Sequence, residues 1–248
     1  MGNWQNHGPL IIVCHDTFGP FSGMHRKIAD ELAAQTQGIV LVPDFLEGSG
    51  GLCPRYSDEN DQPYQLGFNA FTFRLISGFL WSGMSFYRKY PWDTKHKPLF
   101  VNHLIPFLQS KGIEKFALLG FCYGSWISMK ACNEEAVVKH VTCAVHYHPG
   151  IELLEKNVFG NKDGGVGLCR TCQRPQLIHS TKNESDDWKP DGAAHKLLLE
   201  NDQVPEVQFS LAPQNQSHGF MTRADMRVET NRVAIKEGLD LGVAFLKK

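Results

Sequence analysis

The chain has 248 residues, of which 42% are hydrophobic and 21% charged, a composition typical of a globular protein large enough for one core. Its formal net charge is −1, with acidic and basic residues interspersed, so it lacks the one-sided basic surface of a nucleic-acid-binding protein. No apolar run approaches the roughly 18 to 20 residues that span a bilayer. We therefore expect neither a nucleic acid nor a membrane as a partner.

The N-terminal residues and the cysteines indicate the compartment. Residues 1–6 lack a basic stretch followed by an apolar run, as a secretory signal requires, and Asn6 stands where an N-myristoylation signal has Ser or Thr. The seven cysteines are odd in number and irregularly spaced, which does not favour a disulfide framework. Cys14, Cys132 and Cys143 lie in apolar surroundings and are predicted to be buried thiols. These features favour a cytosolic protein; they do not give its oligomeric state.

The first part of the chain predicts a βαβ unit. Residues 10–14 and 39–42 are short β-branched runs, typical of strands buried on both faces. Between them, Met24, Ile28 and Leu32 recur at helical spacing. A strand, a helix and a strand within about 30 residues imply a parallel sheet. Residues 47–97 give a mixed signal, and the pocket that they form is not defined by the sequence.

The remaining chain continues this alternation. A helix is expected over residues 99–110, with a kink at Pro106, and another over 125–131. Strands are expected at 115–119, 141–145 and 176–180. Residues 206–211 alternate as a half-exposed edge strand does, and 224–247 predict a closing helix. The glycine-rich segment from residue 161 to 172 is predicted to be an irregular surface excursion. The expected fold is one α/β domain over residues 1–248, a mostly parallel central sheet with helices on both faces.

A pentapeptide between a strand and a helix points to catalysis. Gly120-Phe121-Cys122-Tyr123-Gly124 has the small residues two before and two after the centre that a nucleophile elbow needs for its tight turn. Such a turn exposes the Cys122 side chain and places the Tyr123 N–H where it can help to hold an oxyanion. A buried structural cysteine flanked by glycines is the alternative.

A histidine and an acid are expected in fixed order after the nucleophile. His218 lies in a polar loop between the last predicted strand and the last helix, the place of the catalytic base; a solvent-exposed loop histidine is the alternative. The loop over residues 183–190 supplies three carboxylates after the preceding strand. Asp186 is the first choice for the acid that orients the imidazole and Asp187 the second, and the unused carboxylates are expected to be solvated or to cap a helix.

Together these motifs resemble the dienelactone hydrolase family over residues 10 to 246. The resemblance rests on the pentapeptide around Cys122, on the Asp-x-x-x-Pro of Asp186 to Pro190, and on His218-Gly219-Phe220 with Arg223. It implies the α/β-hydrolase fold, a Cys122–His218–Asp186 triad, and cleavage of small esters or lactones, without metal or organic cofactor.

Four further roles follow from the resemblance alone. Asp16 would contact the resting Cys122 thiol, and the Thr17 N–H would complete the oxyanion hole. Arg223 would bind a substrate carboxylate, and His148 would line the pocket. A turn carboxylate for Asp16 and a surface ion pair for Arg223 are the alternatives, and neither Arg55 nor Arg74 lies in a motif that would make it a second carboxylate-binding arginine.

Two other classes of function compete with an esterase. Cys169 and Cys172 could serve thiol redox chemistry or bind zinc, although one such pair is half of a structural zinc site. Alternatively, the chain could be a catalytically silent hydrolase fold that acts as a binding module.

Overall fold

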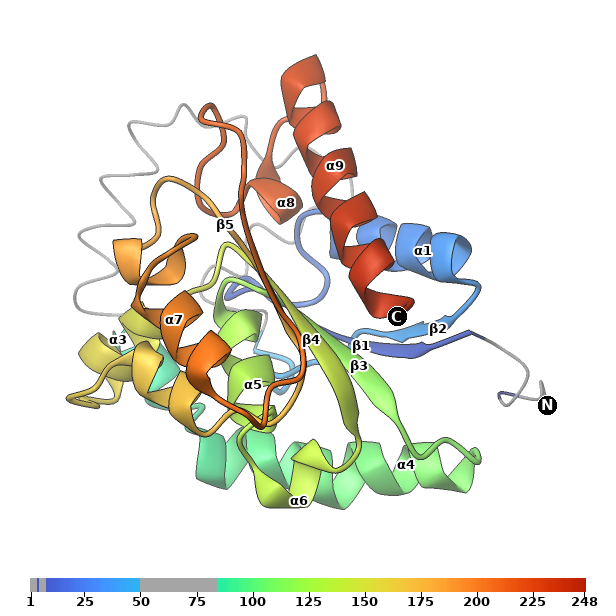
Figure 1. Cartoon of the computed structure of the whole chain (residues 1–248). Coiled ribbons are helices and arrows are strands. Elements are labelled where there is room, and N and C mark those ends of the chain that lie inside the picture. Colours follow the sequence, from blue (N-terminus) through green and yellow to red (C-terminus); the bar gives the residue numbers. More distant parts are fainter. Residues whose placement is uncertain (1–3, 5–7, 50–83) are drawn as a thin grey trace.

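The computed structural model describes residue 4 and residues 8–49 and 84–248. Within these residues, the strands form one parallel sheet in the order β2-β1-β3-β4-β5-β6 (Figure 1). The strands are β1 (Leu10–Cys14), β2 (Ile39–Leu41), β3 (Phe116–Phe121), β4 (Val141–Tyr147), β5 (Gln176–Ser180) and β6 (Val207–Leu211). The predicted parallel α/β sheet is therefore confirmed.

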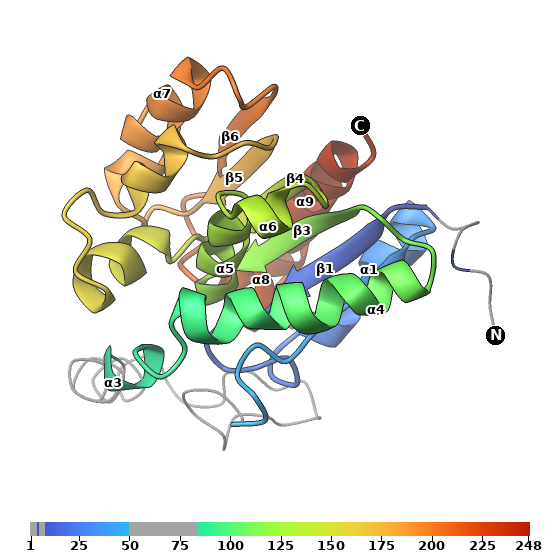
Figure 2. The same cartoon turned by 90° about the horizontal axis from the view of Figure 1, so that it is seen from below.

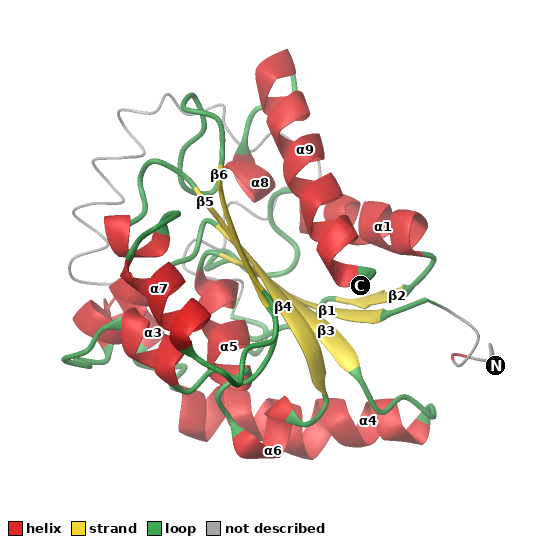
Figure 3. Cartoon of the chain, viewed as in Figure 1, coloured by secondary structure: helices red, strands yellow, loops and turns green. Residues whose placement is uncertain are grey.

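Helices connect the strands and cover both faces of the sheet (Figure 3). The α-helices are α1 (His25–Thr36), α3 (Met84–Tyr87), α4 (Ile105–Ser110), α5 (Tyr123–Ala131), α6 (Glu135–Val138), α7 (Ala193–Glu200), α8 (Phe220–Arg223) and α9 (Glu229–Leu246). Other helical turns are η4 (Trp92–His96), η5 (Leu99–Leu104), η6 (Leu153–Val158), η7 (Gly165–Arg170) and η8 (Asp186–Trp188). No helix of these described ranges is long and apolar enough to cross a bilayer.

Side chains alternate between two apolar clusters along the buried strands, because successive residues of a strand point to opposite faces. In β1, Ile11 packs into the cluster beneath α1 and α9, whereas Ile12 packs into the cluster beneath α4 and α5. Viewed at right angles to Figure 1, the sheet lies between these helical layers (Figure 2). The continuous apolar run of residues 10–14 thus corresponds to a strand that is covered on both sides. The same expectation was wrong for residues 39–42, because β2 lies at the edge of the sheet and is only half-buried.

Two predicted helices differ in detail from the observed ones. The helix over 99–110 changes its winding from the π-helical η5 to α4 near Pro106, which lies at the start of α4 where its missing N–H costs no hydrogen bond. The closing helix, predicted over residues 224–247, begins only at Glu229, as α9, and the short helix α8 ends before the predicted start.

The glycine-rich excursion was predicted to be irregular, but it contains η7, a 3₁₀ helix. This expectation was wrong because Gly165 and Cys169 are buried against the body of the protein, and packing of such residues stabilises a regular turn despite a low intrinsic propensity.

The carboxyl ends of the strands meet at one edge of the sheet. His15 follows β1, Cys122 follows β3, His148 follows β4, and Thr181 follows β5. Ligands of open α/β sheets bind at this edge. The topology therefore brings candidate residues that are far apart in the sequence to one place.

Candidate active site

The main chain turns sharply at Cys122, between β3 and α5. Its φ of 52° and ψ of −109° lie in a region that residues other than glycine adopt at an energetic cost. The Cys122 N–H donates to the Tyr147 carbonyl at 3.1 Å, and the Cys122 carbonyl accepts from the N–H groups of Ser125 and Gly150 at 3.1 and 3.0 Å. These bonds hold the Cys122 side chain, which is partly exposed, at the edge of the sheet where the strands have their carboxyl ends.

The two glycines around Cys122 are required by close contacts between backbones. A Cβ atom on Gly124 would lie 1.9 Å from the Cys14 carbonyl oxygen of β1. A Cβ atom on Gly120 would lie 2.6 Å from the Gly124 carbonyl oxygen. The predicted reason for the Gly-x-Cys-x-Gly spacing therefore matches the packing of the turn against the neighbouring strand.

His218 lies beside the Cys122 sulfur. Its Nε2 atom is 3.0 Å from the Cys122 Sγ, and 38% of the His218 side chain is exposed, so solvent can reach the ring. The residue precedes α8, and its N–H donates to the Asn183 Oδ1 at 3.2 Å. The structure thus brings together the cysteine and the histidine that the sequence selects.

The carboxylate against His218 belongs to Glu184. Its Oε1 atom lies 2.6 Å from the His218 Nδ1, and its Oε2 atom accepts a hydrogen bond from the Thr181 N–H. Because a carboxylate only accepts hydrogen bonds, Nδ1 carries a proton and faces Glu184. Only 3% of the Glu184 side chain is exposed.

The choice of Asp186 as the partner of His218 is therefore corrected. The Asp186 side chain is 98% exposed and pairs with Lys189 at 2.8 Å, and Asp187 accepts a hydrogen bond from the Ser185 hydroxyl. Both aspartates lie in η8, for which Ser185 is the N-cap. The signal that could have found Glu184 is this cap: in Ser-Asp-Asp-Trp, the acids occupy the first turn of a helix, and Glu184 stands before it.

Charges in the site favour a protonated His218. Burial by itself lowers the pKa of His218, but the charge and hydrogen bond of the Cys122 sulfur and those of the Glu184 carboxylate outweigh it and raise the pKa of His218 well above its usual value. An imidazolium beside the sulfur stabilises a thiolate.

Asp16 does not make the predicted contact with the thiol. Its carboxylate oxygens accept hydrogen bonds from the Arg223 Nε and Nη2 at 3.0 Å each, from the Thr222 hydroxyl at 2.9 Å and from the Phe18 N–H at 2.9 Å. Among the contacts of the described residues, none joins Asp16 to the Cys122 sulfur, whose partner is His218. Arg223 is likewise buried and engaged, rather than presented to solvent.

Thr17 and Tyr123, the two residues predicted for the oxyanion hole, follow the carboxyl ends of the neighbouring strands β1 and β3. Tyr123 is the first residue of α5, so its N–H has no partner in the preceding turn of the helix. Thr17 follows β1, and its hydroxyl accepts a hydrogen bond from the Tyr87 hydroxyl at 3.0 Å. The rings of Tyr87 and Tyr123 are in contact, with centroids 5.2 Å apart.

The His148 ring contacts the His218 ring, with the two ring centroids 5.1 Å apart. It is fully buried, and neither ring nitrogen has a hydrogen-bond partner among the described residues. Burial, and then repulsion by His218, lower the pKa of His148 well below its usual value. A ring whose pKa is lowered therefore contacts one whose pKa is raised.

The remaining cysteines of the described part are structural in character. Cys14, Cys132 and Cys143 are buried, as predicted, and so are Cys169 and Cys172. Over residues 8–49 and 84–248, no three histidine, cysteine or acidic side chains are grouped as metal ligands. Arg55 and Arg74 and most of the 47–97 pocket segment lie outside the described residues.

Comparison with known proteins identifies the family. The sequence matches the Dienelactone hydrolase family over residues 2–248. The chain belongs to the dienelactone hydrolase family. This member of the dienelactone hydrolase family is therefore a hydrolase of the α/β-hydrolase fold, as the motifs predicted, and such enzymes act on small molecules. No curated protein matches its sequence.

Solved structures of hydrolases share its fold. A Klebsiella pneumoniae protein assigned as a dienelactone hydrolase is 16% identical, with a TM-score of 0.61 over 98% of this chain and 88% of that one. An acylaminoacyl peptidase of Pyrococcus horikoshii is 14% identical, with a TM-score of 0.58 over 98% of this chain and 37% of that one. An esterase of Pyrococcus furiosus is 15% identical, with a TM-score of 0.55 over 98% and 83%. At these identities the likeness concerns the fold alone.

Proposed function

We propose that this hydrolase cleaves small carboxylic esters or lactones through a Cys122–His218–Glu184 triad and an acyl-enzyme intermediate. One observation carries the proposal: a continuous chain of hydrogen bonds runs from the Cys122 sulfur, which sits on a strained turn, through both nitrogens of His218 to a buried carboxylate. A nucleophile, a base and an orienting acid in this arrangement support acyl transfer.

In the first half of the reaction, His218 holds the proton of the Cys122 thiol, and the thiolate attacks the carbonyl carbon. The imidazolium then gives its proton to the departing alkoxide, which leaves as an alcohol; in a lactone the alcohol stays attached to the acyl group. In the second half, His218 takes a proton from water, the resulting hydroxide attacks the thioester, and the Cys122 thiolate departs again.

The tetrahedral intermediates carry a negative oxygen. We assign its stabilisation to the main-chain N–H groups of Thr17 and Tyr123. Tyr123 begins α5, where the helix dipole adds to the hydrogen bond. Two donors fixed before the substrate arrives need no reorganisation during the reaction.

The decisive experiment is hydrolysis of a short-chain aryl ester and a simple lactone by the wild-type protein and by Cys122→Ala. We expect loss of turnover in the variant, because removal of a nucleophile typically costs about 10⁴-fold or more. Cys143→Ala is the matched control, since it removes a buried thiol of β4 outside the site. Full activity of Cys122→Ala would overturn the proposal.

A second variant, Cys122→Ser, distinguishes thiolate chemistry from general base catalysis. A hydroxyl is far less acidic than a thiol, so His218 cannot hold its proton in the resting state, and we expect a small residual rate. Acylated Cys122, detected by mass spectrometry after rapid quenching, would show the intermediate directly.

A further inference from the structure

A buried ion pair next to the site joins two segments that are 207 residues apart in the sequence. The Arg223 Nε and Nη2 atoms donate to separate oxygens of Asp16 at 3.0 Å each, and the Arg223 and Asp16 side chains are 8% and 3% exposed. This bidentate geometry fixes the relative orientation of the two side chains as well as the distance between them. Since removal of one partner would leave an uncompensated buried charge, the pair constrains both segments that carry it.

One of these segments carries the base. Arg223 is the last residue of α8, and His218 lies two residues before that helix begins. Thr222, also in α8, donates its hydroxyl to the same Asp16 carboxylate at 2.9 Å, and its carbonyl accepts from the Met24 N–H at 2.9 Å. The loop that bears His218 is therefore anchored through α8.

The other segment carries an oxyanion donor. Asp16 precedes Thr17 directly, and its carboxylate accepts from the Phe18 N–H, so it bridges the backbone around Thr17. The Asp16 N–H donates to the His25 Nε2 at 3.1 Å. The Arg223 guanidinium carbon lies over the Phe18 ring, 3.9 Å from the ring centroid. Asp16 and Phe18 are thus held by Arg223 on both sides of Thr17.

We propose that the Asp16–Arg223 ion pair positions the Thr17 N–H against the loop of His218, so that the oxyanion hole and the base keep a fixed distance. The two residues are positioning residues, and this role rests on the proposed function. This positioning role replaces the expectation that Arg223 binds a substrate carboxylate. The Nε and Nη2 edge of the guanidinium, which would bind such a carboxylate, is already hydrogen-bonded to Asp16. Nη2 also donates to the Ser22 hydroxyl at 2.6 Å.

The test separates the oxyanion hole from the nucleophile. Alkylation of Cys122 by iodoacetamide needs the thiolate beside His218 but develops no oxyanion, whereas ester hydrolysis needs both. In Asp16→Asn and Arg223→Lys, we expect kcat for a neutral ester to fall by about 10- to 100-fold, as for a displaced oxyanion donor. We expect KM and the rate of Cys122 alkylation to stay within about twofold of wild type, since neither depends on the oxyanion donors and His218 keeps its own bonds to Asn183 and Glu184.

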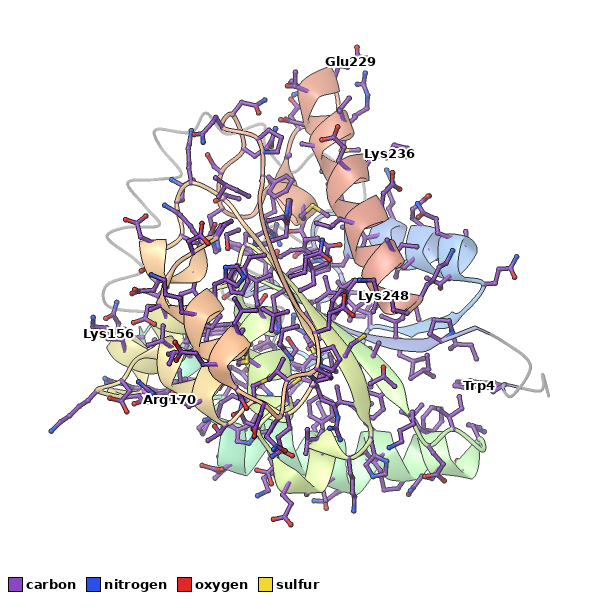
Figure 4. The ribbon with its side chains drawn as sticks, viewed as in Figure 1. Trp4, Lys156, Arg170, Glu229, Lys236 and Lys248 are labelled. Atoms are coloured by element: carbon purple, nitrogen blue, oxygen red, sulfur yellow. The ribbon has the colours of Figure 1, made fainter. Side chains whose placement is uncertain are left out.

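A milder variant provides the test if the variants of the ion pair do not fold, and a surface variant serves as the control. Thr222→Val keeps the ion pair and the shape of the side chain but removes one hydrogen bond to Asp16; we expect kcat to fall about 3- to 10-fold, as for loss of one hydrogen bond. The control is Asp240→Asn, which removes an exposed carboxylate that pairs with Lys236. Lys236 lies on the outer face of α9 and points away from the body of the protein (Figure 4). The turnover of Asp240→Asn should equal that of wild type.

Three results would overturn the positioning role while leaving the triad in place. The first is wild-type kcat in folded Arg223→Lys and Thr222→Val. The second is a rise in KM restricted to esters that carry a carboxylate, which would make Arg223 a substrate anchor. The third is parallel loss of alkylation and turnover, which would show general disruption of the site. Failure of the proposed function is distinguished by Cys122→Ala, which would then remain active.

Discussion

Replacing Glu184 by Gln tests the acid of the site without changing its shape. The carboxylate accepts hydrogen bonds on both oxygens, from the His218 Nδ1 at 2.6 Å and from the Thr181 N–H. An amide can supply only one acceptor. If its oxygen faces Thr181, its NH₂ group faces His218, and the ring must then carry its proton on Nε2, where it can no longer accept the proton of Cys122.

The expected changes in the pKa of His218 and in kcat/KM follow from the negative charge that Glu184→Gln removes. A hydrogen bond to a charged group contributes about 1.5 to 3 kcal/mol, and one pKa unit corresponds to about 1.36 kcal/mol. Because Glu184 is one of the groups that raise the pKa of His218, its neutralisation should lower that pKa by about one to two units. The corresponding fall in kcat/KM is about 10- to 100-fold.

The assay is the pH dependence of hydrolysis of an alkyl ester, whose alkoxide needs a proton to depart. In wild type the protonated His218 persists to a high pH because its pKa is raised. In Glu184→Gln the imidazolium is lost at lower pH, so the alkaline limb of kcat/KM should move down by about one to two pH units.

Asp186→Asn is the matched control, since it makes the same chemical change on a side chain that is 98% exposed. Its profile should equal that of wild type. The reasoning is refuted if Glu184→Gln retains the wild-type rate and profile, or if Asp186→Asn shows the loss in its place.

Three further outcomes test the packing around the site. Gly124→Ala places a Cβ atom 1.9 Å from the Cys14 carbonyl oxygen, so the variant should unfold at a lower urea midpoint and lose Cys122 alkylation; an unchanged midpoint would contradict this contact. Burial would raise the pKa of Asp16, but Arg223 and His25 hold that pKa well below its usual value. The resulting stability of the folded state is present above the unfolded pKa of about 3.9 and is lost as pH falls through the folded pKa. The free energy of unfolding of Asp16→Asn should therefore decrease less in acid than that of wild type. His148→Phe keeps a ring against His218 and removes two nitrogens that have no partner among the described residues. Its unfolding free energy, measured in urea, should therefore equal that of wild type or exceed it by about 1 to 3 kcal/mol; a large decrease would reveal a partner for the His148 ring.

The fold followed from the sequence because its strongest signals come from burial. Runs such as residues 10–14 and 116–119 are apolar on both faces, and only a covered parallel sheet accommodates them. Because the strands of a parallel sheet end at the same edge, Cys122 and the His218 loop were expected to lie together at that edge. Periodicity gives no such information about helix winding or exact helix ends, so the π-helical turn before Pro106 and the start of the last helix at Glu229 could not be derived from it.

The site was predicted less completely because three carboxylates crowd one loop. Spacing alone does not show which of them turns inward, and the difference between Glu184 and Asp186 is set by the cap at Ser185. Arg223 posed a similar problem. A basic side chain at the end of a short helix has the same appearance in the sequence whether it faces a substrate or a buried aspartate 207 residues away.

The separation of these partners along the chain also orders the events of biosynthesis. Cys122 precedes His218 by 96 residues, and Asp16 precedes Arg223 by 207. As the chain leaves the ribosome, the sheet can begin to form around a thiol that still lacks its base, and Asp16 stays unpaired until the segment bearing α8 emerges. The hydrogen-bonded pair of Cys122 and His218 can therefore form only after the segment bearing α8 has been made.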